Sequence, residues 1–339
     1  MSTSPLPDRP NAFVLGSGSW GTAIASVLVH NCASVTAYGK DLEAMEAINT
    51  THTNPHYLPG VDLPPELKAT DSIEGAAEAD LIAFVVPSSV TAVVAADLAK
   101  VPLKPGVILV SCAKGIELGT GRRMSQIIGE TLPDHSLAVL SGPNHAEEVS
   151  RKLASCAVIS SEDQEVALAL QKLFTTPYFR FYTGDDMAGL ELGGAIKNVY
   201  AIAAGCAKGL GLGDNAIAAL VTRGLAELTR LGVALGGRPE TFMGLSGVGD
   251  LMVTCYSEHS RNHRFGLALG KGVSIKEAEE SLGMVAEGVP NTKSIHEAAR
   301  RVGVRTPLLD AVYGTLYENK EAAALLQELL TRAPRPELE

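Results

Sequence analysis

The sequence has little of several residues and patterns that mark specialised protein classes. Its 339 residues include only five cysteines and no CxxC pair, which is typical of reduced thiols in a cytosolic protein and not of a disulfide framework. Aromatic residues make up 5% of the chain, and Trp20 is the one tryptophan. His259 and His263 are four residues apart, but no third ligand stands at a supporting spacing, so we expect no metal site.

Long apolar runs and an excess of basic residues are also missing. No window approaches the roughly 20 uncharged apolar residues that span a bilayer. The start MSTSPLPDRP lacks the apolar core of a secretory signal. A formal net charge of -10 argues against a protein that binds nucleic acid by neutralising phosphates. We therefore expect a cytoplasmic protein with no membrane span and no nucleic-acid partner.

Short apolar runs alternate with helix-compatible segments over the first half of the chain. The runs typical of strands are NAFVL, SVTAYGK, DLIAFVVP, GVILVSCAK, HSLAVLSGP, ASCAVISS and RFYTG. Such alternation predicts a parallel sheet with helices on both faces, the doubly wound α/β class. From Met187 onward, long stretches rich in Ala, Leu and Gly show almost no strand signal, which predicts an all-helical second domain.

These changes in pattern divide the chain into four segments. We expect a disordered tail at 1–11, a Rossmann-type nucleotide-binding domain at 12–187, a helical domain at 188–332 and a frayed tail at 333–339. Length alone favours two domains, because single cores rarely grow beyond roughly 250–300 residues.

The stretch VLGSGSWGTA places three glycines between the first predicted strand and the first predicted helix. Gly16, Gly18 and Gly21 fit the GxGxxG pattern. In that pattern the first glycine permits the turn, the second lets a pyrophosphate reach the backbone, and the third packs helix on strand. The helix N-terminus adds unpaired N–H groups for an anion. A strand-to-helix turn without a ligand is the alternative.

The end of the second predicted strand bears on the choice of cofactor. Lys40 stands where an NAD-preferring site usually has an acidic side chain for the ribose hydroxyl. A cation there suits a 2′-phosphate and favours NADPH. Asp41 is one residue further on and would serve NADH, and it is also the predicted N-cap of the next helix.

Lys197 lies in the apolar helical stretch LELGGAIKNVY, behind a pair of glycines. Glycine in a helix interior costs about 1 kcal/mol relative to alanine, so the pair needs a reason. Gly193 and Gly194 precede Lys197 by four and three residues and share its helical face, which lets another group approach beside the ammonium. A snorkelling surface lysine is the alternative.

A third constellation lies in GLSGVGDLMVTCYSEHSRNHRFG. Ser260, Arg261 and Asn262 bring together hydroxyl, guanidinium and amide donors, which suit a phosphate ester. An exposed polar loop is the alternative. Asp250 precedes an apolar run and is compatible with a helix cap.

Two further signals follow predicted strands. Lys114 comes directly after VILVSCA and places a cation at the carboxyl edge of the sheet, where doubly wound folds bind ligands. Asn144 and Glu147 follow AVLSGP at a spacing like that of a capping box at a helix start. Both features are also compatible with residues that only end a strand or begin a helix and bind no ligand.

Six motifs, in their order along the chain, closely resemble the bacterial NAD(P)-dependent sn-glycerol-3-phosphate dehydrogenase family. They are GSGSWGTA, SCAKGIE, SGPNHAEEV, LGGAIKNVYAIAAG, GLSGVGDLMVTCYSEHSRNHRFG and VAEGVPNTK, and they cover the chain from Phe13 to about Leu330. The resemblance implies a Rossmann domain followed by a helical substrate and dimerisation domain, and a homodimer. It also implies an oxidoreductase that reversibly reduces dihydroxyacetone phosphate to sn-glycerol 3-phosphate with NADPH or NADH, for phospholipid synthesis.

The resemblance also implies roles for individual residues. Lys197 matches the general acid/base on the substrate, and Lys114 matches a lysine that touches both cofactor and substrate. The residues that match cofactor contacts are Ser19, Trp20, Lys40, Ala146, Val285 and Glu287, which join Gly16, Gly18 and Gly21 of the glycine turn. The residues that match substrate contacts are Gly142, Asn144, Asp250, Ser260, Arg261 and Asn262, and Arg261 also reaches the cofactor. Many relatives have Ser or Thr followed by Phe where this chain has Asn144 and His145.

The residue types agree with such a reaction. When a ketone is reduced, charge builds on its oxygen, and the Lys197 ammonium would stabilise that charge and donate a proton. Lys114 would lower the pKa of Lys197 and Asp250 would raise it, and the sequence leaves open which dominates. Two alternatives stay open: a β-hydroxyacid dehydrogenase of related architecture, and a nucleotide sensor without turnover. The Ser260–Asn262 cluster argues against the first, and Lys197 beside paired glycines argues against the second.

Overall fold

The computed structural model describes residues 4–284, 286–333 and 336–337. Eight strands form one sheet in the order β10-β9-β8-β7-β6-β1-β2-β5. Their bounds are β1 (Asn11–Leu15), β2 (Ser34–Tyr38), β5 (Leu67–Thr70), β6 (Leu81–Phe84), β7 (Ile108–Ser111), β8 (Ser136–Ser141), β9 (Ser155–Ser161) and β10 (Phe179–Gly184). A small separate hairpin pairs β3 (Thr53–Asn54) with β4 (Leu58–Asp62). The doubly wound α/β class predicted for this half is confirmed.

Helices cover both faces of the sheet, because its strands bury both sets of side chains. Val14 of β1 belongs to one apolar cluster, while its neighbours Phe13 and Leu15 belong to another on the opposite face. The covering helices are α1 (Ser19–Leu28), α2 (Leu42–Thr50), α3 (Thr91–Leu98), α4 (Met124–Thr131), α5 (Ala146–Ser150) and α6 (Gln164–Phe174). We call residues 11–184 the sheet half.

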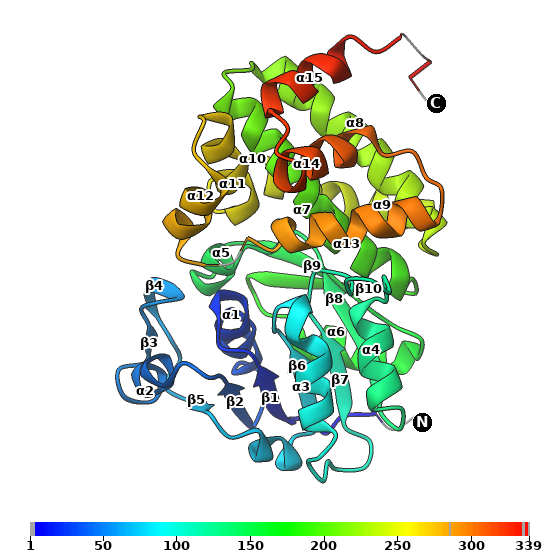
Figure 1. Cartoon of the computed structure of the whole chain (residues 1–339). Helices are drawn as coiled ribbons and strands as arrows, with labels where there is room; N and C mark the ends of the chain where they lie inside the picture. The colour runs from blue at the N-terminus through cyan, green and yellow to red at the C-terminus, as the bar shows by residue number, and fades with distance from the viewer. Residues whose placement is uncertain (1–3, 285, 334–335, 338–339) are drawn as a thin grey trace.

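Residues 187–333 form a helical half, as predicted, and Figure 1 shows it stacked on the sheet half with α13 along the junction. Its helices are α7 (Met187–Gly209), α8 (Asp214–Ala234), α9 (Pro239–Phe242), α10 (Asp250–Tyr256), α11 (Arg261–Gly270), α12 (Ile275–Leu282), α13 (Gly288–Arg301), α14 (Pro307–Tyr317) and α15 (Ala322–Leu330). A single π-helical turn, Leu245–Gly249, precedes α10. No helix among the described residues is long and apolar enough to cross a membrane.

Helix α7 is the centre of the helical half and is buried along most of its length. It packs very closely on α11, because small residues face each other along the seam. A Cβ on Gly205 would lie 2.0 Å from the carbonyl oxygen of His263, and one on Gly266 would lie 2.0 Å from that of Ile202. Glycine is therefore required for this approach, and the seam fixes the position of α7.

Two buried carboxylates tie α7 and α8 to the N-termini of other helices. Glu191 of α7 accepts hydrogen bonds from the backbone N–H of Ser125 at 2.7 Å and from Arg123 at 2.6 Å, beside the start of α4. Glu227 of α8 accepts from the backbone N–H of Leu308 at 2.9 Å, at the start of α14. Each carboxylate satisfies backbone donors that a helix start leaves unpaired.

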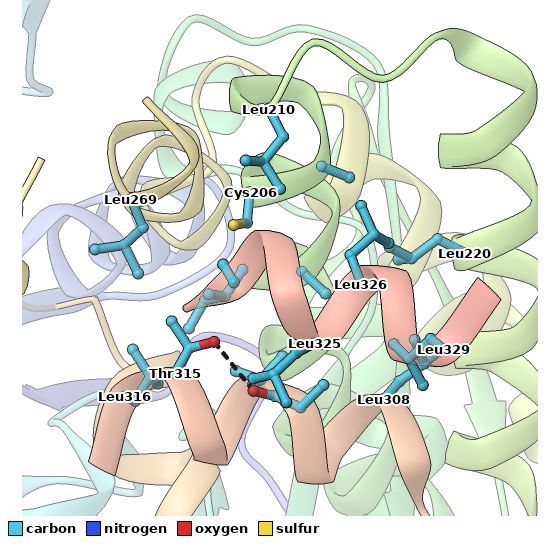
Figure 2. A pocket seen from close by; sticks show the side chains of 16 residues that line it. Cys206, Leu210, Leu220, Leu269, Leu308, Thr315, Leu316, Leu325, Leu326 and Leu329 are labelled. Carbon is cyan, nitrogen blue, oxygen red and sulfur yellow. Dashed lines mark hydrogen bonds between the residues drawn. The ribbon is translucent and has the colours of Figure 1, made fainter. Parts of the chain in front are cut away.

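An apolar cavity lies beneath the C-terminal helix α15 (Figure 2). It has a volume of about 50 Å³ and is bordered by α7, α8, α11, α14 and α15. Leu325, Leu326 and Leu329 of α15 point toward it, and each is only half-buried. Helix α15 therefore covers the cavity without filling it.

The structure differs from the sequence-based predictions in three places. Neighbouring strands run parallel except for β8 and β9, which are antiparallel, so the sheet is mixed. Residues 4–10 are mostly exposed but are held to the sheet half, because Leu6 and Pro10 are buried and Arg9 donates to the Cys32 carbonyl at 2.7 Å. Strand β5 was not expected, because LKAT lies in a proline-rich stretch with a polar pattern. The domain boundaries remain a prediction, and the predicted tail at 333–339 lies mostly outside the described residues.

Candidate active site

A cleft of about 720 Å³ lies between the two halves, at the carboxyl ends of the central strands. It opens where the strand order reverses, between β1 and β6, which is the usual ligand site of doubly wound sheets. The predicted site residues that line it are Gly16, Gly18, Ser19, Trp20, Gly21, Lys40, Lys114, Asn144, Ala146, Lys197, Ser260, Arg261, Asn262 and Glu287. The fold thus brings both predicted sets of contacts to one place.

The glycine turn has the geometry that a dinucleotide needs. Gly16 has φ of +119°, and a Cβ there would lie 2.4 Å from the Val85 carbonyl oxygen. A Cβ on Gly21 would lie 1.9 Å from the carbonyl oxygen of Gly16, so α1 packs directly on the turn. Around Gly18 nothing lies within 4 Å of a Cβ, and no side chain caps the start of α1. The residues present therefore fit a pyrophosphate on the N-terminus of α1.

Lys40 and Asp41 lie at the end of the cleft beyond β2. The Lys40 Nζ lies 4.9 Å from the centre of the Tyr38 ring and is exposed. Asp41 caps α2 by accepting the backbone N–H of Ala44 at 3.1 Å, and its second oxygen faces His56 Nδ1 at 3.3 Å. The predicted N-cap role of Asp41 is confirmed, so its carboxylate already has partners, while Lys40 lines the cleft with its ammonium over the Tyr38 ring.

Two lysines share one buried carboxylate at the cleft floor. Lys114 donates to one oxygen of Asp250 at 2.9 Å, and Lys197 donates to the other. Lys197 also donates to Thr254 Oγ1 at 2.7 Å. Lys114 makes two more hydrogen bonds, to the Gly142 carbonyl at 3.1 Å and to Asn144 Oδ1 at 2.9 Å. Asp250 and Gly142 thus lie behind the cleft lining, where they hold the lysines.

Burial decides the protonation of this cluster. Removal from water lowers the pKa of Lys197 to about 7; Asp250 opposes the shift, and Lys114 adds to it. Burial also disfavours ionised Asp250, but the two lysines outweigh that effect and hold its pKa below the usual value. Desolvation therefore has a larger effect on the pKa of Lys197 than either Lys114 or Asp250.

The paired glycines of α7 make room for two neighbours. A Cβ on Gly193 would lie 2.5 Å from the Ser246 carbonyl oxygen, in the π-helical turn that leads to Asp250. A Cβ on Gly194 would lie 2.9 Å from Oγ of Ser141 and 3.4 Å from Cγ of Lys114, so Ser141 makes the closer approach. The close approach predicted from the sequence is that of Ser141 and of the segment carrying Asp250, and Lys114 lies at ordinary contact distance beside them.

The Ser260–Asn262 cluster begins helix α11. Ser260 caps the helix by accepting the backbone N–H of His263 at 3.2 Å. Asn262 donates to Asn198 Oδ1 at 3.0 Å and accepts from the backbone N–H of Gly288 at 2.9 Å, so it ties α7 to α13. Arg261, between Ser260 and Asn262 in the sequence, also lines the cleft.

The remaining predicted cofactor contacts differ in their hydrogen bonding and burial. Ser19 donates to the Tyr57 carbonyl at 2.7 Å, and Trp20 packs against the sheet core with its Nε1 buried and without a hydrogen-bond partner among the described atoms. Burial raises the pKa of Glu287, which Arg261 and the two cleft lysines oppose. Val285 lies outside the described residues.

The predicted capping box at Asn144 and Glu147 is wrong. Helix α5 begins at Ala146 after His145, and no side chain caps it. The side-chain oxygen Oδ1 of Asn144 instead accepts from Lys114, because the partly buried ammonium needs several acceptors.

Sequence reasoning missed three buried polar residues of the site. Thr254, the acceptor of Lys197, follows Asp250 by four residues, and this helical spacing was the signal that could have found it. Asn198 adjoins Lys197 and lines the cleft. Asn291 of α13 donates to the Lys114 carbonyl at 2.7 Å, a long-range contact with no local signature.

Comparisons with known proteins agree with this geometry. Residues 11–167 match the family model for the NAD-dependent glycerol-3-phosphate dehydrogenase N-terminus, and residues 186–327 match the one for its C-terminus. A glycerol-3-phosphate dehydrogenase [NAD(P)+] of Streptomyces coelicolor is 47% identical over 96% of this chain and 98% of its own length. One from Enterococcus faecalis is 46% identical over 96% of this chain and 97% of its own.

Solved structures give the same result. The crystal structure of a glycerol-3-phosphate dehydrogenase from Coxiella burnetii matches with a TM-score of 0.92 and 36% identity, over 96% of this chain and all (100%) of the other. A yeast glycerol-3-phosphate dehydrogenase matches with a TM-score of 0.81 and 30% identity, again over 96% and 100%. The chain therefore belongs to the NAD-dependent glycerol-3-phosphate dehydrogenase family.

Proposed function

We propose that this chain reduces dihydroxyacetone phosphate reversibly to sn-glycerol 3-phosphate, with Lys197 as the general acid and base. Membership of the family supports the reaction and the use of NAD or NADP. The observation that carries the lysine assignment is the buried Lys197–Asp250–Lys114 cluster, which lies in the same cleft as the glycine turn. A bound NAD(P)H supplies the hydride.

Lys197 has the properties that the proton transfer requires. Its pKa of about 7 lets it donate a proton to the developing alkoxide during reduction and accept one during oxidation at neutral pH. Asp250 and Thr254 orient the ammonium, since both accept hydrogen bonds from it. Lys114 contributes a second positive charge to the ketone oxygen, in a site where burial strengthens electrostatic effects.

The substrate phosphate binds at the start of α11. Arg261 offers a planar fork of donors for phosphate oxygens, and it stands at the start of a helix, whose macrodipole favours an anion. Asn262 keeps this end of α11 against α7, so the phosphate and the ketone are held at a fixed separation. Binding energy from the phosphate then orients the ketone for reaction.

Several finer assignments belong to the same proposal. NADPH is favoured over NADH because Lys40 lines the cleft without an acidic partner among the described residues, while Asp41, which also lines it, is engaged as a helix cap. The family resemblance supports a cytoplasmic homodimer that supplies phospholipid synthesis. It also supports an NAD(P)-binding domain at 12–187 and a substrate and dimerisation domain at 188–332.

Oxidation of NADPH and NADH by the purified protein tests the reaction. We expect absorbance at the nicotinamide band to fall on adding dihydroxyacetone phosphate, and to stay constant with unphosphorylated dihydroxyacetone. A faster rate with NADPH is expected at equal, subsaturating cofactor. Binding of either cofactor without any oxidation would exclude the proposed reaction and leave the sensor alternative.

A further inference from the structure

Lys114 lies outside regular secondary structure, although the proposed mechanism needs its ammonium at a fixed place. Strand β7 ends at Ser111 and α4 begins at Met124, so neither element holds the Lys114 backbone. Among the described residues, the hydrogen-bond partner of the Lys114 carbonyl is Nδ2 of Asn291, at 2.7 Å. The lysine stem is a flexible chain of four carbons, so the point at which its backbone is fixed limits where the ammonium can reach.

Asn291 belongs to the first turn of α13, in the other half of the molecule. It is only 1% exposed, and its side chain lies against the residue that follows Lys114, because a Cβ on Gly115 would lie 2.7 Å from Asn291 Oδ1. Gly115 does not have a positive φ, so the close approach of Asn291 and Ser88, and not the backbone conformation, requires glycine here. The Asn291 amide is therefore packed on this segment as well as hydrogen-bonded to it.

The same turn of α13 is also held against two other parts of the site. The backbone N–H of Gly288 donates to Asn262 Oδ1 at 2.9 Å, beside the proposed phosphate site. A Cβ on Gly288 would lie 2.9 Å from the carbonyl oxygen of Asn198, the residue that follows Lys197. The start of α13 thus contacts α7, α11 and the segment of Lys114, and it fixes their relative positions.

We propose that Asn291 is a positioning residue, which holds the Lys114 backbone so that the Lys114 ammonium meets the ketone oxygen together with Lys197. This inference rests on the proposed function. The ammonium has three donors, and three acceptors of the protein already take them, so a substrate oxygen must replace one. During that exchange the hydrogen bond from Asn291 keeps the backbone end of Lys114 in place. The alternative is that Asn291 only satisfies a buried carbonyl and does not affect the reaction.

The pKa of Lys197 reports where the Lys114 charge lies, because that charge lowers it. The other titratable groups that interact with Lys197 are Asp250, His145, Cys255 and Glu287. A substitution at position 291 changes none of them directly. If the Lys114 ammonium moves away, the pKa of Lys197 rises. The pH above which reduction slows and the pH below which oxidation slows should then both increase.

Asn291→Leu tests the proposal, because leucine has nearly the shape of asparagine and cannot donate a hydrogen bond. We expect kcat for reduction of dihydroxyacetone phosphate to fall about 10- to 100-fold, since displacing a reacting group by about 1 Å can cost about 100-fold. The KM for the ketone should stay within about threefold, because Arg261 and the start of α11 are unchanged. In initial rates between pH 6 and 10, the pH at which reduction slows should rise by about 0.5 to 1 unit.

Thr292→Val is the matched control on the same helix. Thr292 is also fully buried, but its hydroxyl donates within α13, to the Gly288 carbonyl at 2.6 Å. This variant should keep kcat within about twofold and leave the pH profile unchanged. Asn291→Ala removes the same amide without adding bulk, and it repeats the test if circular dichroism shows that Asn291→Leu does not fold.

Each outcome decides the inference. A fall in kcat with an unmoved pH profile would make Asn291 a structural support of α13 and overturn the inference. A kcat within twofold of the unmodified protein, or an equal fall in Thr292→Val, would overturn it as well. Failure of the unmodified protein to oxidise either cofactor would instead reject the proposed function.

Discussion

Lys114 and Asp250 form an ion pair of 2.9 Å across the two halves of the molecule, although 136 residues separate them in the chain. Lys114 follows β7 in the sheet half, and Asp250 begins α10 in the helical half. The carboxylate that receives Lys114 also receives Lys197. One of the contacts that join the halves therefore also arranges the proposed reaction centre.

Replacing Lys197 tests its role as the proton donor. Lys197→Met keeps most of the side-chain volume, and Asp250 retains Lys114 as its partner. We expect kcat to fall by about 10²- to 10⁴-fold, the usual contribution of general acid–base catalysis, while the Kd for NADPH stays within about twofold. Steady-state kinetics and fluorescence titration measure the two quantities. Exposed Lys271→Met is the matched control, and a loss below tenfold in Lys197→Met would remove Lys197 from the mechanism.

The pKa of Lys197 predicts opposite pH profiles for the two directions. Reduction needs the ammonium, so its kcat/KM should fall as pH rises above about 7. Oxidation needs the neutral amine, so its kcat/KM should fall as pH drops below about 7. Rates in both directions between pH 6 and 10 measure this. A reduction rate that stays level to pH 10 would contradict the assignment, and the residual activity of Lys197→Met should lack this limb.

Lys40 sets the expected preference for NADPH. Lys40→Ala removes a charge that would contact the 2′-phosphate, so the KM for NADPH should rise about tenfold, while the KM for NADH changes less than twofold. Kinetics with each cofactor at saturating ketone measure both values. Lys68→Ala on β5 is the control, because Lys68 is also exposed but does not line the cleft. Equal increases for both cofactors would show that Lys40 does not read the 2′-phosphate.

Glu227 predicts a pH dependence of stability. Burial raises its pKa from 4.5 to about 7, against the opposing effect of the Leu308 and Leu309 N–H groups. The folded state then binds a proton that the unfolded state releases above pH 4.5, so the free energy of unfolding should fall between pH 5 and 7. The loss amounts to at most about 3 kcal/mol.

Urea unfolding of the unmodified protein and of Glu227→Gln measures this contribution. The amide cannot ionise, so the variant should lose less stability over the same pH interval. Other buried carboxyls, such as Glu191, also have raised pKa values and affect both proteins alike. Identical slopes would mean that Glu227 does not titrate in this range.

The fold and the cleft lining could be predicted because their signals are local. Short apolar runs mark strands, and the glycine turn stands at the end of the first one. The direction of β9 could not be predicted, because side-chain periodicity is the same in parallel and antiparallel strands.

The reaction centre could be predicted only in part. Gly193 and Gly194 indicated a close neighbour on the face of α7 that carries Lys197, but the groups that approach the two glycines most closely belong to Ser246 and Ser141, which are distant in sequence. The pKa of Lys197 could not be derived either, because the sequence offers two opposing charges while burial has the largest effect. Desolvation depends on the whole fold and has no local signature.

The cavity beneath α15 predicts that this part of the structure responds to hydrostatic pressure. Compression favours states that eliminate loosely packed volume, so we expect rising pressure to detach α15, whose half-buried leucines border the cavity. The glycine seam between α7 and α11 offers no such gain, because its backbones are already in contact. We therefore expect the C-terminal helix to respond to pressure before the contact between α7 and α11 does.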